Sequence, residues 1–448
     1  MKKQWLGLVV VATFGLLWDS RADVQNIRIS GDIRTRGYYF AQAIDGDVSW
    51  QDSSAFIEQR TTVSFEADLD DHVLVVVSLT ADGLWGAPDQ SSTAGPGTED
   101  DGGGAIDRGW SLGVTEAYIQ LSEMFYSPAT LKLGRQYITY GRGLIISSYD
   151  QSYNYDAGRL ILDYYPLTVN LDGVRSADNG TFGGDSNHQA TDLIWLNAKY
   201  ELSDSIIKNI EGYFGWVIQS AHNGTSSTNV PPSINGASPM LIGGRMDLTP
   251  ADSLKVWLEG AYEWGSDGTV NHNDNIGAFI ANAGADFTIK DATWSPVLHA
   301  NYIVASGGGN KGDANFVPWF NYQEGLNGYL FVPNLSNIHI FNLGGTVKPF
   351  NNTSFSVQGY YYLKFDADSP AGSNINMDYG GLEFTRETPQ SGSRELGWEI
   401  DATLAYDYSR DVRLQLIYGC FIPGGAYVNS PFASAVASEV RGEVNVKF

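Results

Sequence analysis

Polar and apolar residues alternate along much of this 448-residue chain. Successive side chains of a β-strand point to opposite faces, so this period of two predicts strands with one polar and one apolar face. The final residues, 439–448, show the same pattern and end on Phe448. The clearest of the other segments are GDIRTRGYYF (31–40), IEQRTTVSFEADL (57–69), DLIWLNAKYEL (192–202), SLKVWLEGAYEW (253–264), SFSVQGYYYLKF (354–365) and LGWEIDATLAYDYS (396–409).

Short and long connections alternate between the predicted strands. The short ones lie at 68–72, 202–205, 249–253, 349–354 and 408–412. The long ones lie at about 41–55, 86–113, 177–191, 221–238, 308–336, 366–393 and 426–434. Bacterial outer-membrane barrels have short periplasmic turns and longer external loops. The pattern therefore predicts an all-β transmembrane barrel, antiparallel and up-and-down, of about 18 strands with both termini in the periplasm. A soluble β-sandwich is a weaker alternative, because an array of sandwich domains would show linkers.

Residues 1–22 are a predicted signal peptide. Lys2 and Lys3 precede an apolar run, and Ser20 to Ala22 fit a cleavage site. The run is too short to span a bilayer, and no later apolar run is long enough, which excludes a helical membrane protein. The predicted domains are the signal peptide at 1–22 and one barrel at 23–448, placed in the bacterial outer membrane after export.

Composition agrees with a membrane barrel and narrows its chemistry. The 12 Trp, 25 Tyr and 20 Phe residues suit aromatic girdles at both membrane interfaces. The single Cys420 cannot form an internal disulfide. The formal charge of −24 argues against a nucleic-acid partner, and much of the acid lies in predicted loops, where it indicates a solvated surface.

Catalytic and metal motifs are not evident. The six histidines lack metal-ligand spacing, and no Gly-x-Ser-x-Gly motif stands out. His299 is expected to face inward beside Asn301 and to make a hydrogen bond in the lumen. We therefore predict no catalytic residue, no metal and no cofactor.

Residue parity assigns most charged side chains to the lumen. Val63 and Phe65 mark the lipid face of one strand, which places Glu58 and Arg60 inside. Arg or Lys facing lipid near the midplane would cost about 2–4 kcal/mol. The same rule sends inward Asp32, Arg34, Arg36, Glu66, Lys132, Arg159, Asp163, Lys199, Glu201, Arg245, Asp247, Lys255, Glu259, Glu263, Asp286, Lys364, Glu399, Asp401, Arg413, Glu439 and Arg441. Such a lining fits a hydrated pore, although these pairs could also only brace the wall.

Several blocks of the chain resemble the alginate-export family of outer-membrane porins. LKLGRQYITYGRGLIISSYDQSYNYDAGRLILDYY (131–165) is similar to that family's Gly-Arg-Gln strand, Tyr-Gly turn and return strand. GWEIDATLAYDYSRDVRLQLIYGCFIPGG (397–425) is similar to its penultimate hairpin, and IRTRGYYF with FIEQRTTVSFEADLDDHV to its first. The resemblance implies a monomeric barrel that exports an anionic polysaccharide through an Arg-lined constriction.

The resemblance also implies site residues, with two complications. Carried over by motif, they are Arg34, Arg36, Arg60, Arg135, Gln136, Arg142 and Arg159. Arg135 has the lipid-facing parity of Leu131 and Leu133, so it requires a bulge or a position above the lipid band. Arg142, in the YGRG turn, is expected at the outer mouth. The inward set contains at least as many acids as bases, so a neutral glycan, a small solute or a cation would fit as well as alginate.

The predicted function is a channel for passive passage of polar solutes or a polysaccharide, narrowed by loops folded in at 86–113 and 308–336. The predicted pore-lining residues are Arg34, Arg36, Arg60, Arg135, Arg142, Arg159, Lys199, Arg245, Glu58 and Asp163. Expected partners are outer-membrane lipid, the solute, and the barrel-assembly machinery through the strand that ends at Phe448. The alternatives are a plugged barrel that acts as a surface-loop platform or adhesin, and an outer-membrane hydrolase.

Overall fold

The computed structural model describes most of the chain after residue 25. The described residues are 26–41, 53–86, 110–148, 154–178, 190–203, 205–219, 238–266, 275–308, 315–319, 327–331, 333, 335–368, 376–379, 382–385, 392–427 and 436–448. The predicted signal peptide and most of the predicted loop at 86–113 lie outside them. No helix within these ranges is long and apolar enough to cross a membrane.

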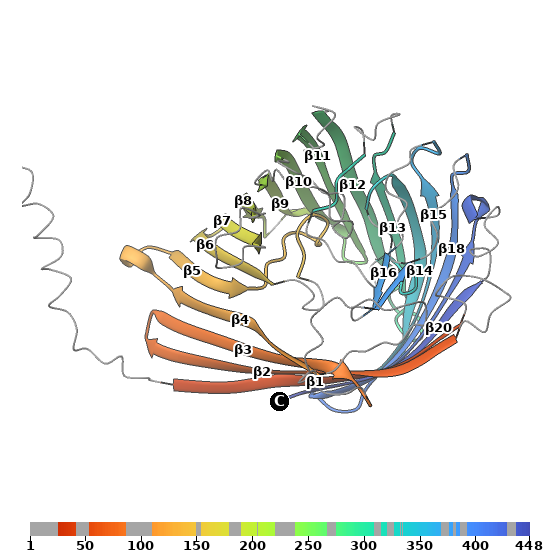
Figure 1. Cartoon of the computed structure of the whole chain (residues 1–448), viewed down its shortest axis with the longest axis horizontal. Coiled ribbons are helices and arrows are strands. Elements are labelled where there is room, and N and C mark those ends of the chain that lie inside the picture. The colour runs from red at the N-terminus through yellow and green to blue at the C-terminus, as the bar shows by residue number, and fades with distance from the viewer. Residues whose placement is uncertain are drawn as a thin grey trace, which may run out of the picture.

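Eighteen antiparallel strands form one closed barrel (Figure 1). Each strand pairs with its neighbours in sequence, β15 pairs with β18, and β20 pairs with β1 to close the ring. The predicted fold and strand number are confirmed. The strands are β1 (Asn26–Ala41), β2 (Ser53–Asp70), β3 (Val73–Leu84), β4 (Ser111–Leu121), β5 (Ala129–Gln136), β6 (Tyr155–Tyr164), β7 (Leu167–Asp178), β8 (Ala190–Glu201), β9 (Ile207–Gln219), β10 (Ser238–Ala251), β11 (Leu254–Ser266), β12 (Asn275–Thr288), β13 (Val297–Ala305), β14 (Ile338–Phe350), β15 (Thr353–Lys364), β18 (Glu395–Asp407), β19 (Val412–Pro423) and β20 (Ala437–Lys447).

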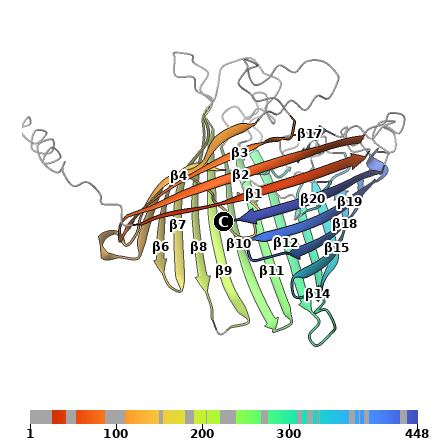
Figure 2. The same ribbon diagram turned by 90° about the horizontal axis from the view of Figure 1, so that it is seen from below.

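The remaining elements are short and lie in the connections. Strands β16 (Asn376–Tyr379) and β17 (Leu382–Thr385) pair with each other between β15 and β18. Two 3₁₀ turns, η1 (Met124–Tyr126) and η3 (Gly425–Tyr427), follow β4 and β19. The short turns lie at the same end of the barrel as Asn26 and Phe448, and the long connections lie at the other end (Figure 2). This is the predicted arrangement.

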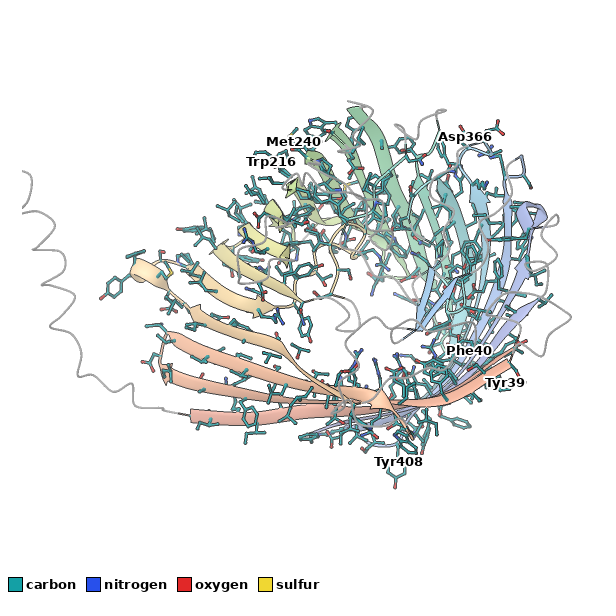
Figure 3. All side chains as sticks on the ribbon, viewed as in Figure 1. Tyr39, Phe40, Trp216, Met240, Asp366 and Tyr408 are labelled. Carbon is teal, nitrogen blue, oxygen red and sulfur yellow. The ribbon has the colours of Figure 1, made fainter. Side chains whose placement is uncertain are left out.

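The two faces of the wall follow the predicted parity. On β1, Arg34 and Phe40 are buried while Ile33 and Tyr39 are exposed. Figure 3 shows Phe40 toward the interior and its neighbour Tyr39 on the outside. Large apolar side chains such as Leu416, which is 53% exposed, therefore cover the outer surface. An apolar exterior of this kind is stable only against lipid.

The C-terminal strand behaves as its sequence predicts. Val440 and Val444 are exposed on the outer face, while Glu439 and Arg441 are buried on the inner face. Phe448 pairs with Gly31 of β1 through two backbone hydrogen bonds of 2.9 and 3.0 Å. A Cβ at position 31 would lie 2.3 Å from the backbone oxygen of Thr62 on β2 and 2.7 Å from Cζ of Phe448, so glycine is needed here.

The main buried apolar cluster fills part of the lumen. Two long connections fold inward and pack on the wall: residues 137–148, between β5 and β6, and the described residues between β13 and β14, which are 306–308, 315–319, 327–331, 333 and 335–337. The gold trace that follows β5 enters the ring in Figure 1. The predicted infolding at 308–336 is confirmed for the described residues of that range, whereas the infolding of 137–148 was not predicted.

Candidate functional site

The first infolded connection, residues 137–148, is held against the wall by apolar packing and by hydrogen bonds of the Tyr140 hydroxyl. Ile138 and Ile145 are buried in the luminal cluster. The Tyr140 hydroxyl donates to the carboxylate of Asp172 on β7, and Nη2 of Arg159 donates to the same hydroxyl at 3.0 Å. Burial raises the pKa of Tyr140, and the charge of Asp172 raises it further, so the phenol remains a donor.

The tip of this connection is seated on β11. The backbone N–H of Arg142 donates to the carboxylate of Glu259, and the guanidinium carbon of Arg142 lies 3.9 Å from the ring centroid of Trp257. Gly141 has φ +58°, and a Cβ there would lie 2.9 Å from Oε1 of Glu259. A glycine is therefore needed for the close approach and for the turn.

The position of Arg142 corrects the prediction that it lies at the outer mouth. Trp257 is only three residues from Leu254, where β11 begins at the short-turn end. The Arg142 side chain is nevertheless exposed, and no other residue of the segment 137–148 is charged. The infolded tip thus presents a guanidinium to the lumen, well below the loop end.

The second infolded connection is bound through its backbone to a carboxylate of β18. The N–H groups of Tyr329 and Leu330 each donate to Oε1 of Glu399 at 2.8 Å. The N–H of Phe331 donates to Oε2 at 2.8 Å. Glu399 is fully buried, and the Phe331 ring stacks on Phe421 at 4.3 Å between centroids.

A second wall carboxylate holds another part of the same connection. Oε2 of Glu263 on β11 accepts from the backbone N–H of Val317 at 3.0 Å. Oε1 accepts from the indole N–H of Trp319 at 2.8 Å, and Glu263 is fully buried. Each of four inward acids thus accepts a hydrogen bond from an infolded connection, and we name this set the anchor carboxylates: Asp172, Glu259, Glu263 and Glu399.

The predicted basic residues of β1, β2 and β6 face inward. Arg34 lies directly opposite Arg60 in the register of β1 and β2. Nε of Arg36 lies 2.6 Å from Glu443, and Nε of Arg159 lies 3.2 Å from Asp172. Like charges in register are unfavourable unless neighbours or solvent compensate, and the inward positions on either side carry Asp32 on β1 and Glu58 on β2.

The other predicted lining residues make pairs along the inner face. Glu58 accepts from the Tyr38 hydroxyl at 3.2 Å. The remaining contacts are Asp163 with Thr168 at 3.1 Å, Lys199 with Glu201 at 2.7 Å, and Arg245 with Asp247 at 2.7 Å. The structure therefore does not gather all the predicted residues at one point. It distributes them around the wall: Arg142 belongs to the first infolded connection, and Arg159 donates to Tyr140 of that connection.

Arg135 is a correction to the predicted lining. Its guanidinium makes two hydrogen bonds, of 2.8 and 3.0 Å, to Asp156, whose side chain is on the outer face of β6. Gly134 has φ +125°, and Arg135 follows the outward parity of Leu133. The pair lies near the loop end of β5 and β6, where a charge can leave the lipid band, so Arg135 does not line the pore.

We expect Arg135→Ala to leave single-channel conductance and ion preference unchanged. The pair with Asp156 is on the outer face and about half exposed, so its loss should cost less than about 1 kcal/mol. Planar-bilayer recording with a salt gradient checks the first expectation, and urea unfolding in liposomes checks the second. A shift in ion preference would place Arg135 on the permeation path.

His299 connects three strands on the inner face. Its Nδ1 lies 2.7 Å from Asp286 and its Nε2 lies 2.9 Å from the Thr346 hydroxyl, which donates onward to Ser356. This is the hydrogen-bonded lumen position expected from the sequence. Within the described ranges, no group of three or more His, Cys, Asp or Glu side chains could hold a metal ion.

Sequence reasoning placed three of the anchor carboxylates inside but missed what they do. It missed Asp172 altogether, although Asp172 shares the parity of Asn170 and Val174, which also face inward. The role of Glu259, Glu263 and Glu399 depends on backbone N–H groups of distant connections, and no side-chain pattern marks such donors.

The comparisons with known proteins agree with this architecture. The family model for alginate export matches residues 28–440. The chain is similar to the crystal structure of Pseudomonas aeruginosa OccK2 (OpdF) in complex with glucuronate, with 11% identity, a TM-score of 0.56, and coverage of 95% of this chain and 97% of that one. It is also similar to P. aeruginosa OccK11 (OpdR), at 13% identity, TM-score 0.54, and 96% and 99% coverage. At these identities the likeness shows the fold. No curated protein matches the chain.

Proposed function

The chain belongs to the alginate export family and is an outer-membrane channel for solutes, and from that premise we propose that it is passive and prefers anions. The observation that carries the proposal is the use of the luminal acids. The anchor carboxylates accept hydrogen bonds from the connections folded into the lumen, while Arg142 at the tip of one connection stays exposed. The permeating ion therefore meets a guanidinium where the sequence alone suggests a balance of charges.

The chemistry of the lining favours a carboxylate-bearing sugar as the cargo. Arginine binds a carboxylate with two parallel N–H donors, and a planar guanidinium or an indole can stack on a sugar face. Arg142 stacked on Trp257 offers both kinds of contact. The OccK2 structure contains glucuronate, and we extend that class, a uronate, to this channel as part of the proposal. Ring charges select ions collectively, so Arg34, Arg36, Arg60 and Arg159 are proposed to add to the field.

Three further features belong to the same proposal. Residues 1–22 would direct export and be removed. The strand ending at Phe448 would be recognised by the barrel-assembly machinery, which the exposed apolar face of that strand supports. The chain would work as a monomer, as the family resemblance implies, and the channel requires no catalytic group.

Single-channel recording of the refolded protein in a planar bilayer tests the proposal. We expect conductance, and in a salt gradient a reversal potential of the sign given by anion preference. Added glucuronate should reduce the current more than neutral glucose does. Cation preference would discard the anionic cargo but keep the channel, and a closed barrel with no current would favour a plugged surface-loop platform.

Arg142→Glu should move the reversal potential toward cations. The substitution replaces the exposed positive charge of the infolded tip with a negative one, in a pore where nearby charges act with little screening. Lys199→Glu is the matched control, because Lys199 also faces inward but lies in an exposed pair near the short-turn end. An equal shift for both variants would mean that the tip has no special weight in selectivity.

A further inference from the structure

We propose that Glu263 and Glu399 are positioning residues that set the aperture of the pore by holding two segments of the connection between β13 and β14, residues 315–319 and 327–331, against the wall. The proposal rests on the protein being a channel and not on which ion it prefers. The two carboxylates belong to different strands, β11 and β18, and bind two different segments of the same connection. The connection is therefore fixed to the wall at two separate points, through residues 317 and 319 and through residues 329–331.

The contact at Glu399 provides the stronger hold. Three successive backbone N–H groups, those of Tyr329, Leu330 and Phe331, converge on one carboxylate. Consecutive N–H groups that point to one side form a concave anion site, here after Gly328 at φ +122°. Leu330 and Phe331 are fully buried, so water does not readily replace the lost acceptor. Hydrogen bonds to a charged group are stronger than those to a neutral one, and a buried donor left without an acceptor destabilises the position that it occupies.

The wall itself does not need these carboxylates. Strand β18 is hydrogen-bonded along its length to β15 on one side and to β19 on the other. Strand β11 is likewise paired with β10 and β12. Loss of a carboxylate should therefore release the connection while the barrel stays closed. Two of the acids that the sequence places on the inner wall, Glu263 and Glu399, therefore hold the segments that narrow the pore.

The first experiment compares Glu399→Gln and Glu263→Gln with the wild-type channel in planar bilayers. Glutamine keeps the size of the side chain but presents an NH₂ group to at least one N–H donor. We expect higher open-channel conductance, larger current noise and loss of the steady open level. Asp407→Asn is the matched control on β18, since it removes an inward carboxylate whose partner is Arg413 of the wall. It should leave the noise unchanged.

Chemical rescue separates position from charge. In Glu399→Ala the three N–H groups face a space shaped for a carboxylate, so acetate should restore the quiet open level, and acetamide should not. A tether provides an independent route: a Cβ at Gly419 would lie 3.5 Å from Cβ of Leu330, within the range for a disulfide. Leu330→Cys with Gly419→Cys, in the Glu399→Ala, Cys420→Ser background, should be quiet when oxidised and noisy when reduced.

Heat-modifiable migration in gels verifies that each variant forms a barrel. Folded variants with wild-type conductance and noise would overturn the proposal. So would a noisy Glu399→Ala channel that neither acetate nor the oxidised tether makes quiet. If Glu399→Ala does not form a barrel, Glu263→Gln alone decides, because it releases only the contacts of Val317 and Trp319. None of these readouts depends on the sign of the selectivity, so the proposed anion preference stands or falls separately.

Discussion

Replacement of Glu439 by alanine is expected to lower the free energy of unfolding by about 3–5 kcal/mol, the usual result of removing one partner from a buried ion pair. Nε of Arg441 lies 2.7 Å from Oε1 of Glu439, and the two side chains are 1% and 0% exposed. The Arg441 guanidinium also lies over the rings of Tyr38 and Tyr329, at 4.8 and 5.3 Å from their centroids. Without Glu439, this packed cation loses the carboxylate beside it.

Urea unfolding of the barrel in liposomes measures this effect. Asp407→Ala serves as the control, because its pair with Arg413 is about half exposed on both sides and should change stability by less than about 1 kcal/mol. The double variant Glu439→Ala, Arg441→Met should recover much of the loss, since neither charge of this pair then remains buried. Equal effects of Glu439→Ala and Asp407→Ala would contradict the assignment of a dry pair at the β1–β20 seam.

Leu416→Arg should destabilise the barrel by about 2–4 kcal/mol, whereas Gln415→Arg should have almost no effect. The two residues are neighbours on β19 and lie at nearly the same depth in the membrane. Leu416 is 53% exposed on the lipid face, and Gln415 faces the lumen opposite Glu443 in the register of β20. An arginine at 416 must be taken into hydrocarbon, while an arginine at 415 gains an acidic neighbour.

Equilibrium unfolding of both variants in the same lipid gives the comparison directly. Repeating it in a thinner bilayer should reduce the cost for Leu416→Arg, because the guanidinium then reaches the interface. A similar cost at both positions would show that the two faces of β19 are not lipid and water. Wild-type stability for Leu416→Arg would have the same meaning.

The barrel was predictable because its signal is local. Each strand alternates polar and apolar residues, as in Glu58 to Phe65 on β2, and this period of two does not depend on the conformation of the loops. The alternation of short and long connections predicted the up-and-down topology, because short turns join the strands at one end of such a barrel and longer loops join them at the other. Parity was the better guide at Arg135: the family motif placed this residue in the pore, whereas it shares the parity of Leu133 and lies on the outer face beside Asp156.

The constriction was not predictable to the same degree, because its signal is not local. Arg142 is recognisable as part of a turn, but its contact with Trp257 depends on a connection that crosses to a distant strand. The acceptors Glu263 and Glu399 look like pore-lining acids in sequence, and their partners are backbone N–H groups with no side-chain signature. A list of inward acids therefore includes carboxylates that are buried beneath the infolded connections.

The pairing of β1 with β20 also dictates the order in which the molecule can assemble. Asp32 is in register with Lys447, so the contacts that close the ring join residues from the two ends of the chain. Until the last strand arrives, β1 and the growing edge both present unpaired N–H and C=O groups, which lipid cannot satisfy. Contacts of such long sequence separation form slowly. Barrel closure is thus a late, all-or-none event that must follow the synthesis of β20, and a chain without β20 has two open edges where the closed barrel has none.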